Sequence, residues 1–590
     1  MEESILTNPK QFWTYMKQNR ANSTYPATMS YAGTVASSGE NICELFSSFF
    51  HSTFLSSSSD TIHDNNPRQS CSDIATVRID KDEVVKLLRS LDVSKSAGPD
   101  LLPAIFFVKC ASEISIPVSI LFRRSIDEGI MPIVWKSAFI TPIHKKGSRD
   151  CVEHYRPISK LCLLAKVFER IIYNQLYESI KSDLSPTQHG FLKQRSTVSN
   201  LLLLNDFVTF SMNAGDQVDT IYTDYSKAFD RIDHKLLLLK LGYLGIRGDL
   251  FRWFTSYVHN RSQAVVLNGY TSSWRCIPSG VPQGSLLGPL LFVIFITDID
   301  SCFQHSHHLL FADDMKVYRV VNNESDALLL QQDLNRLDIY CERNKLDLNV
   351  SKCYFMTFTR KPSPFSTNYS VKNQYLTRVS NMRDLGVTHD SKLLFDKHID
   401  DIVSKASKAL GFLMRSSKKF KNMKTVKLLY CSYVRSHLEY ACQVWNPNYE
   451  TYSDRIEKIQ RKFTRYLKFK FNISVNMTYE QRCAKFHLLP LHLRRIISDI
   501  ILLIKIIRGS CDCPSLLRKI NINVPARKFR NNKVFFVPSV STNYRKNSYI
   551  LRACSTFNNL SSETDLDIFC SGIDSLKKYV IRTFVASIQQ

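Results

Sequence analysis

The sequence of 590 residues contains no apolar run long enough to cross a membrane. Its longest run, Ile496–Ile507, is interrupted by Asp499 and Lys505 and is shorter than the ~20 residues that a spanning helix needs. We therefore interpret this run as a buried helix and expect no membrane partner. The first 20 residues also lack an apolar core behind a basic start, so the sequence indicates no secretion signal.

Closely spaced metal-binding pairs are missing as well. The 16 cysteines occur singly, without a CxxC pair, and Cys511 and Cys513 stand too close together for the usual zinc spacing. His305, His307 and His308 have no Cys or acidic partner at helical spacing, so we predict no zinc site there. Free thiols are typical of a reducing compartment, which predicts an intracellular protein.

Acidic residues are few relative to basic ones. The chain has 53 Asp and Glu against 78 Lys and Arg, which gives a formal net charge of +25. Such a chain repels itself unless an anionic partner neutralises it, and the usual partners are nucleic acid or an acidic membrane surface. The apolar content of 44% excludes a wholly disordered chain, and the length allows about three or four structural units.

The residue pattern divides the chain into four parts. Residues 1–75 have the composition of an extension or linker, since Ser and Asn are frequent and only Ile42–Phe50 shows a clear helical pattern. Residues 76–390 alternate strand and helix patterns, which predicts an α/β domain. Residues 391–475 are mostly helical and rich in Lys and Arg, and residues 476–590 form a basic region of mixed pattern.

Local signals mark individual elements. Asp80 and Glu83 match a capping box at the start of an amphipathic helix. Asn268-Gly269, between two strand patterns, predicts a tight hairpin. Aromatic residues at helical spacing are interpreted as core rather than as a stacking platform: Trp253, Phe254 and Tyr257.

Two acidic clusters can carry chemistry. A β-rich stretch ends at Asp224, and two apolar strand patterns flank the adjacent pair Asp313 and Asp314. Neighbouring carboxylates between apolar strands are costly, because like charges repel and neither is readily solvated. A divalent metal is the natural compensation, since Mg²⁺ binds carboxylate and phosphate oxygens. Two such ions ~3.5–4 Å apart can activate an attacking 3′-hydroxyl and stabilise a leaving pyrophosphate.

A loop that contains glycine and proline, Ser279–Pro289, separates the two clusters. Its glycines let the backbone approach a ligand closely, and Gln283 can hydrogen-bond such a ligand. Ser285 is placed to cap the apolar helix that follows it.

The order of these segments resembles a known family. TDYSKAFDRIDH from Thr223, GVPQGSLLGPLLF from Gly280 and LLFADD from Leu309 resemble the palm of reverse transcriptases, most of all the non-LTR retrotransposon group with its jockey-like branch. Further matching segments include QHGFLKQRST from Gln188 and NKLDLNVSKCYFMTF from Asn344. The resemblance covers residues 80–470 strongly and the remainder more weakly.

The resemblance implies a role for each acidic residue. Asp224 and Asp313 would bind two Mg²⁺ ions, for which Mn²⁺ can substitute, and Asp314 would complete the metal site. Phe229, five positions after Asp224, matches an aromatic residue that clashes with a ribose 2′-hydroxyl. That clash is a steric reason for making DNA rather than RNA.

The resemblance also implies substrate contacts. Gln283 and Gly284 would line the incoming nucleotide and the template base. Arg156 matches an arginine of the fingers, whose planar fork suits triphosphate oxygens, although a structural ion pair is the alternative. Either Lys145 or Lys146, in a predicted hairpin turn, would supply a second cation.

Two lysine assignments have alternatives of their own. Lys352 matches the position proposed to protonate the departing pyrophosphate, and it can equally be a solvated surface lysine. The lysines from Lys418 onward would contact phosphates in a polymerase thumb, or they form a solvated helix face.

The fold implied is an α/β (α+β) right-hand polymerase, with fingers and palm around an antiparallel catalytic sheet and a helical thumb and C-terminal region behind. The implied activity is Mg-dependent transfer from a dNTP to a primer 3′-hydroxyl on an RNA template. The partners would be template RNA and primer or target DNA, in cytoplasm and nucleus, and the oligomeric state stays open.

Two alternative functions compete with this one. The first is a catalytically silent, nucleic-acid-binding transposon relic, which the intact aspartates disfavour. The second is a group II intron maturase, which the long agreement around Asp224 and Gln283 disfavours. Full-length relatives usually carry an endonuclease domain before the polymerase, and some carry RNase H or a Cys/His knuckle after it. None of these patterns occurs here, so we expect a truncated element or a polymerase-only form, and its ability to nick its own target stays open.

Overall fold

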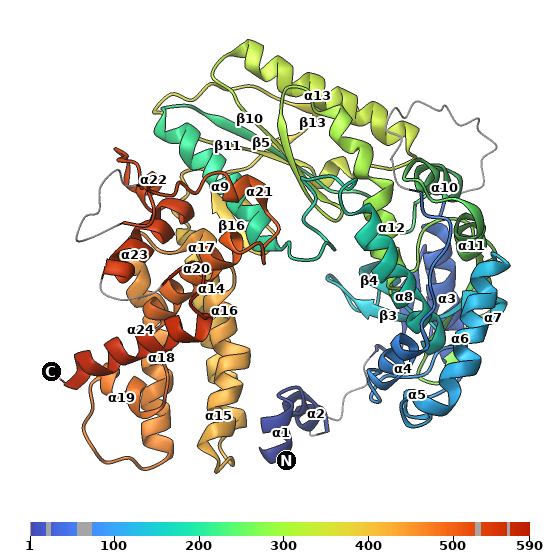
Figure 1. Ribbon diagram of the computed structural model, residues 1–590, viewed down its shortest axis with the longest axis horizontal. Coiled ribbons are helices and arrows are strands. Elements are labelled where there is room, and N and C mark those ends of the chain that lie inside the picture. The colour runs from blue at the N-terminus through green and yellow to red at the C-terminus, as the bar shows by residue number, and fades with distance from the viewer. Residues whose placement is uncertain (1, 19–24, 56–72, 525–532, 563–566, 590) are drawn as a thin grey trace.

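The computed structural model describes residues 2–18, 25–55, 73–524, 533–562 and 567–589. Its ribbon forms an arch, with the N-terminal half, in blue and teal, on one side and the C-terminal helices, in orange and red, on the other (Figure 1). Helices α1 (Glu2–Thr7) and α2 (Gln11–Gln18) lie across from the rest of the N-terminal half. They contact the C-terminal side, where backbone N–H groups of Lys421 and Asn422 donate to the Glu2 carboxylate.

The first large sheet lies on the N-terminal side, and we call it the β3 sheet. Its strands are β3 (Ser137–His144), β4 (Tyr155–Lys160), β6 (Arg261–Leu267), β7 (Tyr270–Thr271) and β8 (Arg275–Ile277). β3 pairs antiparallel with β4 and parallel with β6. The hairpin predicted at Asn268-Gly269 joins β6 to β7, and both of its residues have positive φ.

Part of the predicted extension packs on this sheet. After β1 (Met29–Tyr31) and β2 (Thr34–Ala36), the pattern Ile42–Phe50 is confirmed as helix α3 (Gly39–Ser52), which Ser38 caps. Phe46 and Phe50 share a core with strand residues such as Ile140 and Val265. The sequence pattern did not reveal this packing, because the partners are about 100 to 200 residues away.

The second large sheet joins the two sides of the arch, and we call it the β5 sheet. Its order is β14-β11-β5-β10-β9, from strands β5 (Val218–Thr223), β9 (His307–Phe311), β10 (Asp314–Val320), β11 (Tyr354–Phe358) and β14 (Thr377–Arg378). All pairs are antiparallel except β11 with β14. Two hairpins stand beside it, β12 (Ser370–Val371) with β13 (Gln374–Tyr375) and β15 (Asn381–Asp384) with β16 (Val387–Asp390).

Both faces of the β5 sheet are buried, which explains why its strands are so apolar. Ile221 packs into the core of the N-terminal side, whereas Val218 and Tyr222 pack into the core shared with the C-terminal helices. Successive side chains of a strand point to opposite faces, so one strand serves both cores.

Helices surround both sheets on the N-terminal side. They are α4 (Lys81–Arg89), α5 (Ala104–Lys109), α6 (Ala111–Asp127), α7 (Ile133–Lys136), α8 (Leu163–Ile180), α9 (Thr197–Asn213), α10 (His234–Tyr243), α11 (Gly248–Val258), α12 (Leu287–Phe295) and α13 (Glu324–Arg343), with short turns η1 (Val152–His154), η2 (Thr297–Cys302) and η3 (Val350–Lys352). The aromatic residues predicted as core in α11 are fully buried. Asp80 caps α4 as predicted, but Glu83 does not close a capping box, because its carboxylate accepts from Asn174 of α8 instead.

The C-terminal side consists mainly of helices in the described residues. Its helices are α14 (Asp396–Ser416), α15 (Met423–Tyr430), η4 (Cys431–Arg435), α16 (Ser436–Glu439), α17 (Cys442–Trp445), α18 (Glu450–Lys470), α19 (Tyr479–Lys485), α20 (Leu491–Ile507), α21 (Pro514–Leu517), α22 (Asn543–Lys546), α23 (Tyr549–Ser562) and α24 (Ile573–Gln589). The apolar run Ile496–Ile507 lies in α20 and is largely buried, as predicted. No helix in the described ranges is both long enough and apolar enough to cross a membrane.

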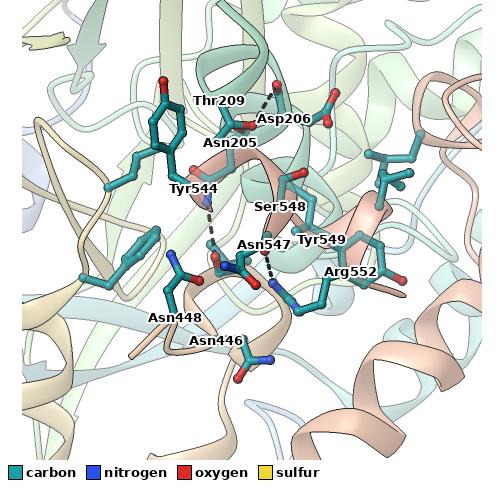
Figure 2. Close-up of a pocket in the computed structure, with 16 residues that line it drawn as sticks. Asn205, Asp206, Thr209, Asn446, Asn448, Tyr544, Asn547, Ser548, Tyr549 and Arg552 are labelled. Atoms are coloured by element: carbon teal, nitrogen blue, oxygen red, sulfur yellow. Dashed lines mark hydrogen bonds between the residues drawn. The ribbon is translucent and has the colours of Figure 1, made fainter. Parts of the chain in front are cut away.

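The last helices dock on the β5 sheet through α9. A small cavity of about 30 Å³ lies between α9 and residues 544–552 and is lined mainly by polar side chains (Figure 2). Arg545 donates to Asp206 at 2.7 Å, and Arg552 pairs with the buried Asp499 at 2.9 Å. The C-terminal region is therefore part of the same packed body as the sheet that carries the acidic residues.

Candidate active site

The register of the β5 sheet brings the two acidic clusters together. Thr223, the last residue of β5, pairs with Met315 of β10, so Asp224 comes to lie beside Asp314. Asp313 occupies the turn between β9 and β10, where Phe311 pairs with Asp314. Residues more than 80 positions apart therefore meet at one end of one sheet, as the sequence predicted.

The turn between β9 and β10 is strained. Ala312 has φ of 57°, in the left-handed region that costs a residue with a Cβ about 1–2 kcal/mol. Strained backbone of this kind is concentrated at functional sites, where the surrounding structure has to hold it in place. Ala312 and Asp313 together form the turn, so Asp313 lies at its tip.

Burial and mutual repulsion act on the turn carboxylates. Burial raises the pKa of Asp313, and the charge of Asp224 raises it further, while Arg156 and Lys145 oppose the rise. The pKa of Asp314 rises to about 6, first through burial and then through Asp313, Asp384 and Asp224. This end of the sheet therefore collects negative charge that a cation would stabilise.

Three basic residues gather around these carboxylates. Lys352 Nζ lies 2.9 Å from Asp224 Oδ2, and the backbone N–H of Asn349 donates to the Asp224 carbonyl at 2.8 Å. Burial lowers the pKa of Lys145, and so do the charges of Arg156 and Lys352, while Asp224 raises it. Both Asp224 and Asp313 thus lie within the electrostatic reach of Lys145.

Of the two lysines that the sequence left open, the structure brings Lys145 to the site. Lys145 follows β3 directly, and its backbone N–H donates to the His154 carbonyl across the predicted hairpin. Both side chains are exposed, and the charge of Lys146 contributes to the lowered pKa of Lys145. Arg156 stands on the facing strand β4, opposite Ile143 of β3.

The glycine-containing loop is tied to the strand that carries Arg156. Ser159 donates its backbone N–H to the Gln283 carbonyl at 2.8 Å, and a Cβ at Gly284 would collide with the Ser159 carbonyl oxygen. Gly284 also has φ of 145°, so glycine is required there for backbone reasons. Ser285 accepts from the Gly288 N–H at 2.8 Å, which confirms the predicted cap on α12.

The side chain of Gln283 has a partner that the sequence analysis missed. Its Nε2 donates to Asp230 Oδ1 at 2.8 Å. Asp230 is buried, and burial raises the pKa of its carboxyl. The only sequence signal for Asp230 was its place in the segment that begins at Asp224.

Phe229 has a fixed ring. It stacks on Phe292 of α12 with 4.6 Å between ring centroids, and it meets Phe191 edge-on at 6.0 Å. The side chain is only partly buried, so one part of a well-held ring stays accessible.

Two further contacts near Asp314 could not be found from the sequence. Lys316 and Asp384 form a buried ion pair between β10 and β15. Gln188, which is 1% exposed, hydrogen-bonds the backbone of Ala312. In each contact the two residues are far apart in the chain, and a single lysine or glutamine gives no sequence signal of its own.

The carboxylates fit a metal site that the substrate completes. No three His, Cys, Asp or Glu side chains of the described residues converge closely enough to hold an ion by themselves. Mg²⁺ is commonly bound by one or two carboxylates together with water and substrate phosphates. Asp224, Asp313 and Asp314 are suitable donors for such an incomplete site, since the charge of Asp224 raises the pKa of both other carboxyls.

Comparison with known proteins identifies the same part of the chain. Residues 143–414 match the family described as "Reverse transcriptase (RNA-dependent DNA polymerase)". Residues 143–414 form a reverse transcriptase domain. All ten predicted site residues, from Lys145 to Lys352, lie within the matched range.

The similar proteins are transposon polymerases, which confirms the resemblance to non-LTR retrotransposons. From Drosophila melanogaster, the probable RNA-directed DNA polymerase from transposon BS is 27% identical over 68% of this chain and 45% of its own length. The RNA-directed DNA polymerase from mobile element jockey is 30% identical over 54% of this chain and 36% of its own. The chain therefore spans less than half the length of these relatives.

Among solved structures, apo telomerase from Candida tropicalis, truncated from its C-terminal domain, matches 44% of this chain and 54% of its own. The identity is 12% and the TM-score is 0.31, which is too low to establish a shared fold. The mixed α/β fold of the reverse transcriptase domain is instead seen directly in the sheets and helices of this structure.

Proposed function

We propose that the chain is an RNA-directed DNA polymerase of a non-LTR retrotransposon. The observation that carries the proposal is the β5–β10 register, which brings Asp224 next to Asp313 and Asp314. In a right-hand description, the β3 sheet belongs to the fingers, the β5 sheet is the palm, and α14 to α18 form the thumb. The divisions near residues 75, 390 and 475 are part of this proposal.

The acidic residues would hold Mg²⁺ or Mn²⁺. When bound, the metal activates the primer 3′-hydroxyl and neutralises charge on the triphosphate during in-line transfer. Asp224 and Asp313 would hold the metal in this proposal, and Asp314 would add a third carboxylate at the start of β10.

The chain's own cations and rings act on the nucleotide. Lys145 and Arg156 bind triphosphate oxygens from two facing strands. Lys352 holds its proton at Nζ beside Asp224 and donates it to the departing pyrophosphate. Phe229 excludes a ribose 2′-hydroxyl, since Phe292 prevents its ring from moving aside. Gln283 and Gly284 line the nucleotide and the template base.

The partners follow from the reaction. Template RNA and a primer or target DNA bind to a chain of net charge +25, and dNTPs are the small substrates. We propose that the protein works inside the cell, in cytoplasm and nucleus, where its RNA and chromosomal DNA are found.

Primer extension tests the proposal. Purified protein is given Mg²⁺, dNTPs and a DNA primer annealed to an RNA template, and it is compared with the Asp313→Asn/Asp314→Asn variant. We expect extension by wild type alone, with equal affinity of both proteins for the primer–template. If neither protein extends the primer although both bind it, the chain is a nucleic-acid-binding relic and the proposed activity is wrong.

A further inference from the structure

The loop between α8 and α9 lies against the catalytic turn. We call residues 185–195 the bracket loop. Its backbone pairs with β9, because the Leu310 N–H donates to the Thr187 carbonyl at 3.0 Å and the His189 N–H donates to the Leu310 carbonyl at 2.8 Å. The loop thus forms an isolated parallel bridge, Gln188 with Leu310, beside the residues that lead into Ala312 and Asp313.

Within the bracket loop, the side chain of Gln188 hydrogen-bonds the backbone of Ala312, the strained residue of the turn. Its Oε1 accepts from the N–H of Ala312 at 2.9 Å and from that of Gly190 at 2.7 Å, and its Nε2 donates to the Ala312 carbonyl at 3.4 Å. A Cβ at Gly190 would collide with the Ala312 backbone, so the loop and the turn are in close contact. The amide of Gln188 therefore compensates both backbone groups of the residue before Asp313.

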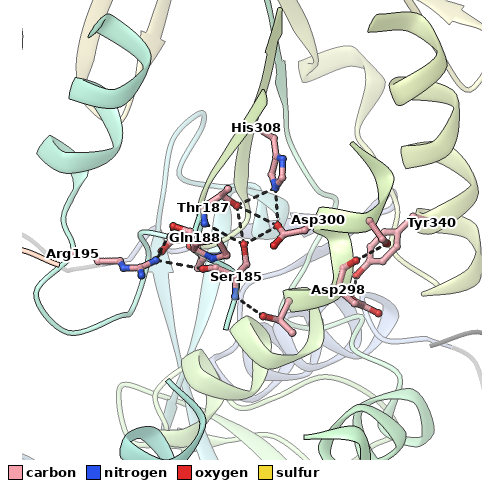
Figure 3. A network of polar contacts seen from close by, with 11 residues as sticks. Ser185, Thr187, Gln188, Arg195, Asp298, Asp300, His308 and Tyr340 are labelled. Carbon is pink, nitrogen blue, oxygen red and sulfur yellow. Dashed lines mark hydrogen bonds and ion pairs between the residues drawn. The ribbon is translucent and has the colours of Figure 1, made fainter. Parts of the chain in front are cut away.

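The far end of the bracket loop is held by Arg195. Its Nη1 donates to the carbonyls of Ser185, Pro186 and Gln188 at 3.3, 3.0 and 2.7 Å (Figure 3). Because one guanidinium nitrogen donates to three carbonyls, Arg195 connects three residues of the bracket loop. Its Nε donates at 2.9 Å to the carboxylate of Asp512, which belongs to the C-terminal region.

A second set of contacts fixes the near end of the loop. Ser185 and Thr187 donate to Asp300 Oδ1 at 2.8 and 3.4 Å, and His308 of β9 lies 2.8 Å from the same oxygen (Figure 3). The loop is thereby held at both ends, so the position of Gln188 is determined from outside the turn.

We propose that Gln188 is a positioning residue for Asp313 and that the C-terminal region stabilises it through the Asp512–Arg195 contact. This inference rests on the proposed polymerase function for its kinetic consequence. It gives a role to residues 511–513, which lie about 200 residues after the catalytic turn. Gln188 itself does not touch the nucleotide; it acts by holding Ala312.

The first test replaces Gln188 with Met, which has similar size but no acceptor. We expect the kcat of primer extension to fall about 10- to 100-fold, the usual cost of removing a residue that orients a metal ligand. KM for dNTP and the affinity for primer–template should stay within about threefold, since no binding contact is lost. Gln188→Glu keeps an acceptor for the Ala312 N–H, so it should recover part of the loss.

Gln460 provides a matched control. It is also a fully buried glutamine, and it donates to the Leu489 carbonyl at 2.9 Å on the C-terminal side, away from the turn. Gln460→Met should lower thermal stability as Gln188→Met does but leave kcat per folded molecule within about twofold. Equal kcat values for the two folded variants would overturn the proposal.

Hydrogen exchange supplies a readout that needs no activity. Gln188→Met should speed exchange of the Ala312 amide, and Asp512→Asn should speed exchange across residues 185–195. Asp574→Asn, the same change at an exposed site in the C-terminal region, should affect neither. Unchanged exchange at Ala312 in Gln188→Met would contradict the proposal even if the wild-type protein extends no primer. In that case the failure of the polymerase function would be seen separately, in the wild-type assay.

Discussion

Lys352 and Asp224 form an ion pair at the site where metal is expected, with 2.9 Å between Nζ and Oδ2. In the proposed polymerase, Asp224 would also hold a metal ion, so Lys352 would compete with that ion for the same carboxylate group.

Replacement of Lys352 should have two effects of opposite sign. Lys352→Met removes the competitor, so the Mg²⁺ concentration for half-maximal extension should fall, by no more than about fivefold because the pair is partly exposed. At saturating Mg²⁺ the kcat should also fall, because pyrophosphate leaves without a proton donor. A magnesium titration of primer extension measures both quantities. Lys352→Arg keeps the competing charge, and a Met variant that needs more Mg²⁺ than this control would contradict the account.

The raised pKa of Asp314 makes stability depend on pH in a defined direction. In the folded protein the carboxyl has a pKa of about 6 against an ordinary 3.8, so the folded state binds the proton more tightly. Stability should therefore fall as pH rises from about 4 through 6. Asp314→Asn should raise the free energy of unfolding at pH 7 by about 1 kcal/mol, because the carboxyl, although packed among protein atoms, stays accessible to water that screens its charge.

Denaturant unfolding in chelator at pH 7 and pH 3.5 measures this effect. The difference between Asp314→Asn and wild type should vanish at the lower pH, where the carboxyl is protonated in both states. A gain that is the same at both pH values would show that the substitution acts through packing rather than charge.

Lys145 and Lys146 form a natural pair of variants. Lys145 interacts electrostatically with Asp224 and Asp313, so Lys145→Ala should raise KM for dNTP about tenfold, as expected for loss of a charge-assisted contact. Lys146→Ala should change it by less than about twofold. Steady-state kinetics with a fixed primer–template provide the measurement. Equal effects of the two substitutions would mean that the site does not select between them.

Phe229 should control the choice of sugar. Phe229→Ala removes the ring that Phe292 holds in place, so the preference for dNTP over rNTP in kcat/KM should fall at least about tenfold, or ~1.4 kcal/mol. Phe191→Ala removes only the edge-on neighbour and should leave the preference near wild type. If Phe229→Ala still rejects rNTPs as strongly as wild type, another residue provides the selection.

The sequence was most informative where chemistry and local pattern coincide. Asp224 and Asp313 each follow an apolar strand pattern, and the resemblance to reverse transcriptases predicted that one antiparallel sheet carries both, as the register shows. The Asn268-Gly269 turn and the buried helix at Ile496–Ile507 were also local patterns, and both are confirmed.

The parts that could not be predicted depend on contacts between distant segments. Gln188 meets Ala312 across 124 residues, and Lys316 meets Asp384 across 68, with no periodic signal for either. Glu83 fits a local capping rule, but its carboxylate accepts a hydrogen bond from the amide of Asn174 instead. Local sequence rules predict helices and strands well, whereas tertiary packing determines which residues support the site.

The most direct test compares two aspartates of one strand segment. Asp224 follows β5 at the site, whereas Asp219 lies buried within β5 and accepts from the Tyr369 hydroxyl at 2.7 Å. In primer extension on an RNA template, Asp224→Asn should reduce kcat by at least about 100-fold. Asp219→Asn should keep it within about fivefold per folded molecule. Extension by the Asp224→Asn protein at the wild-type rate would contradict the account.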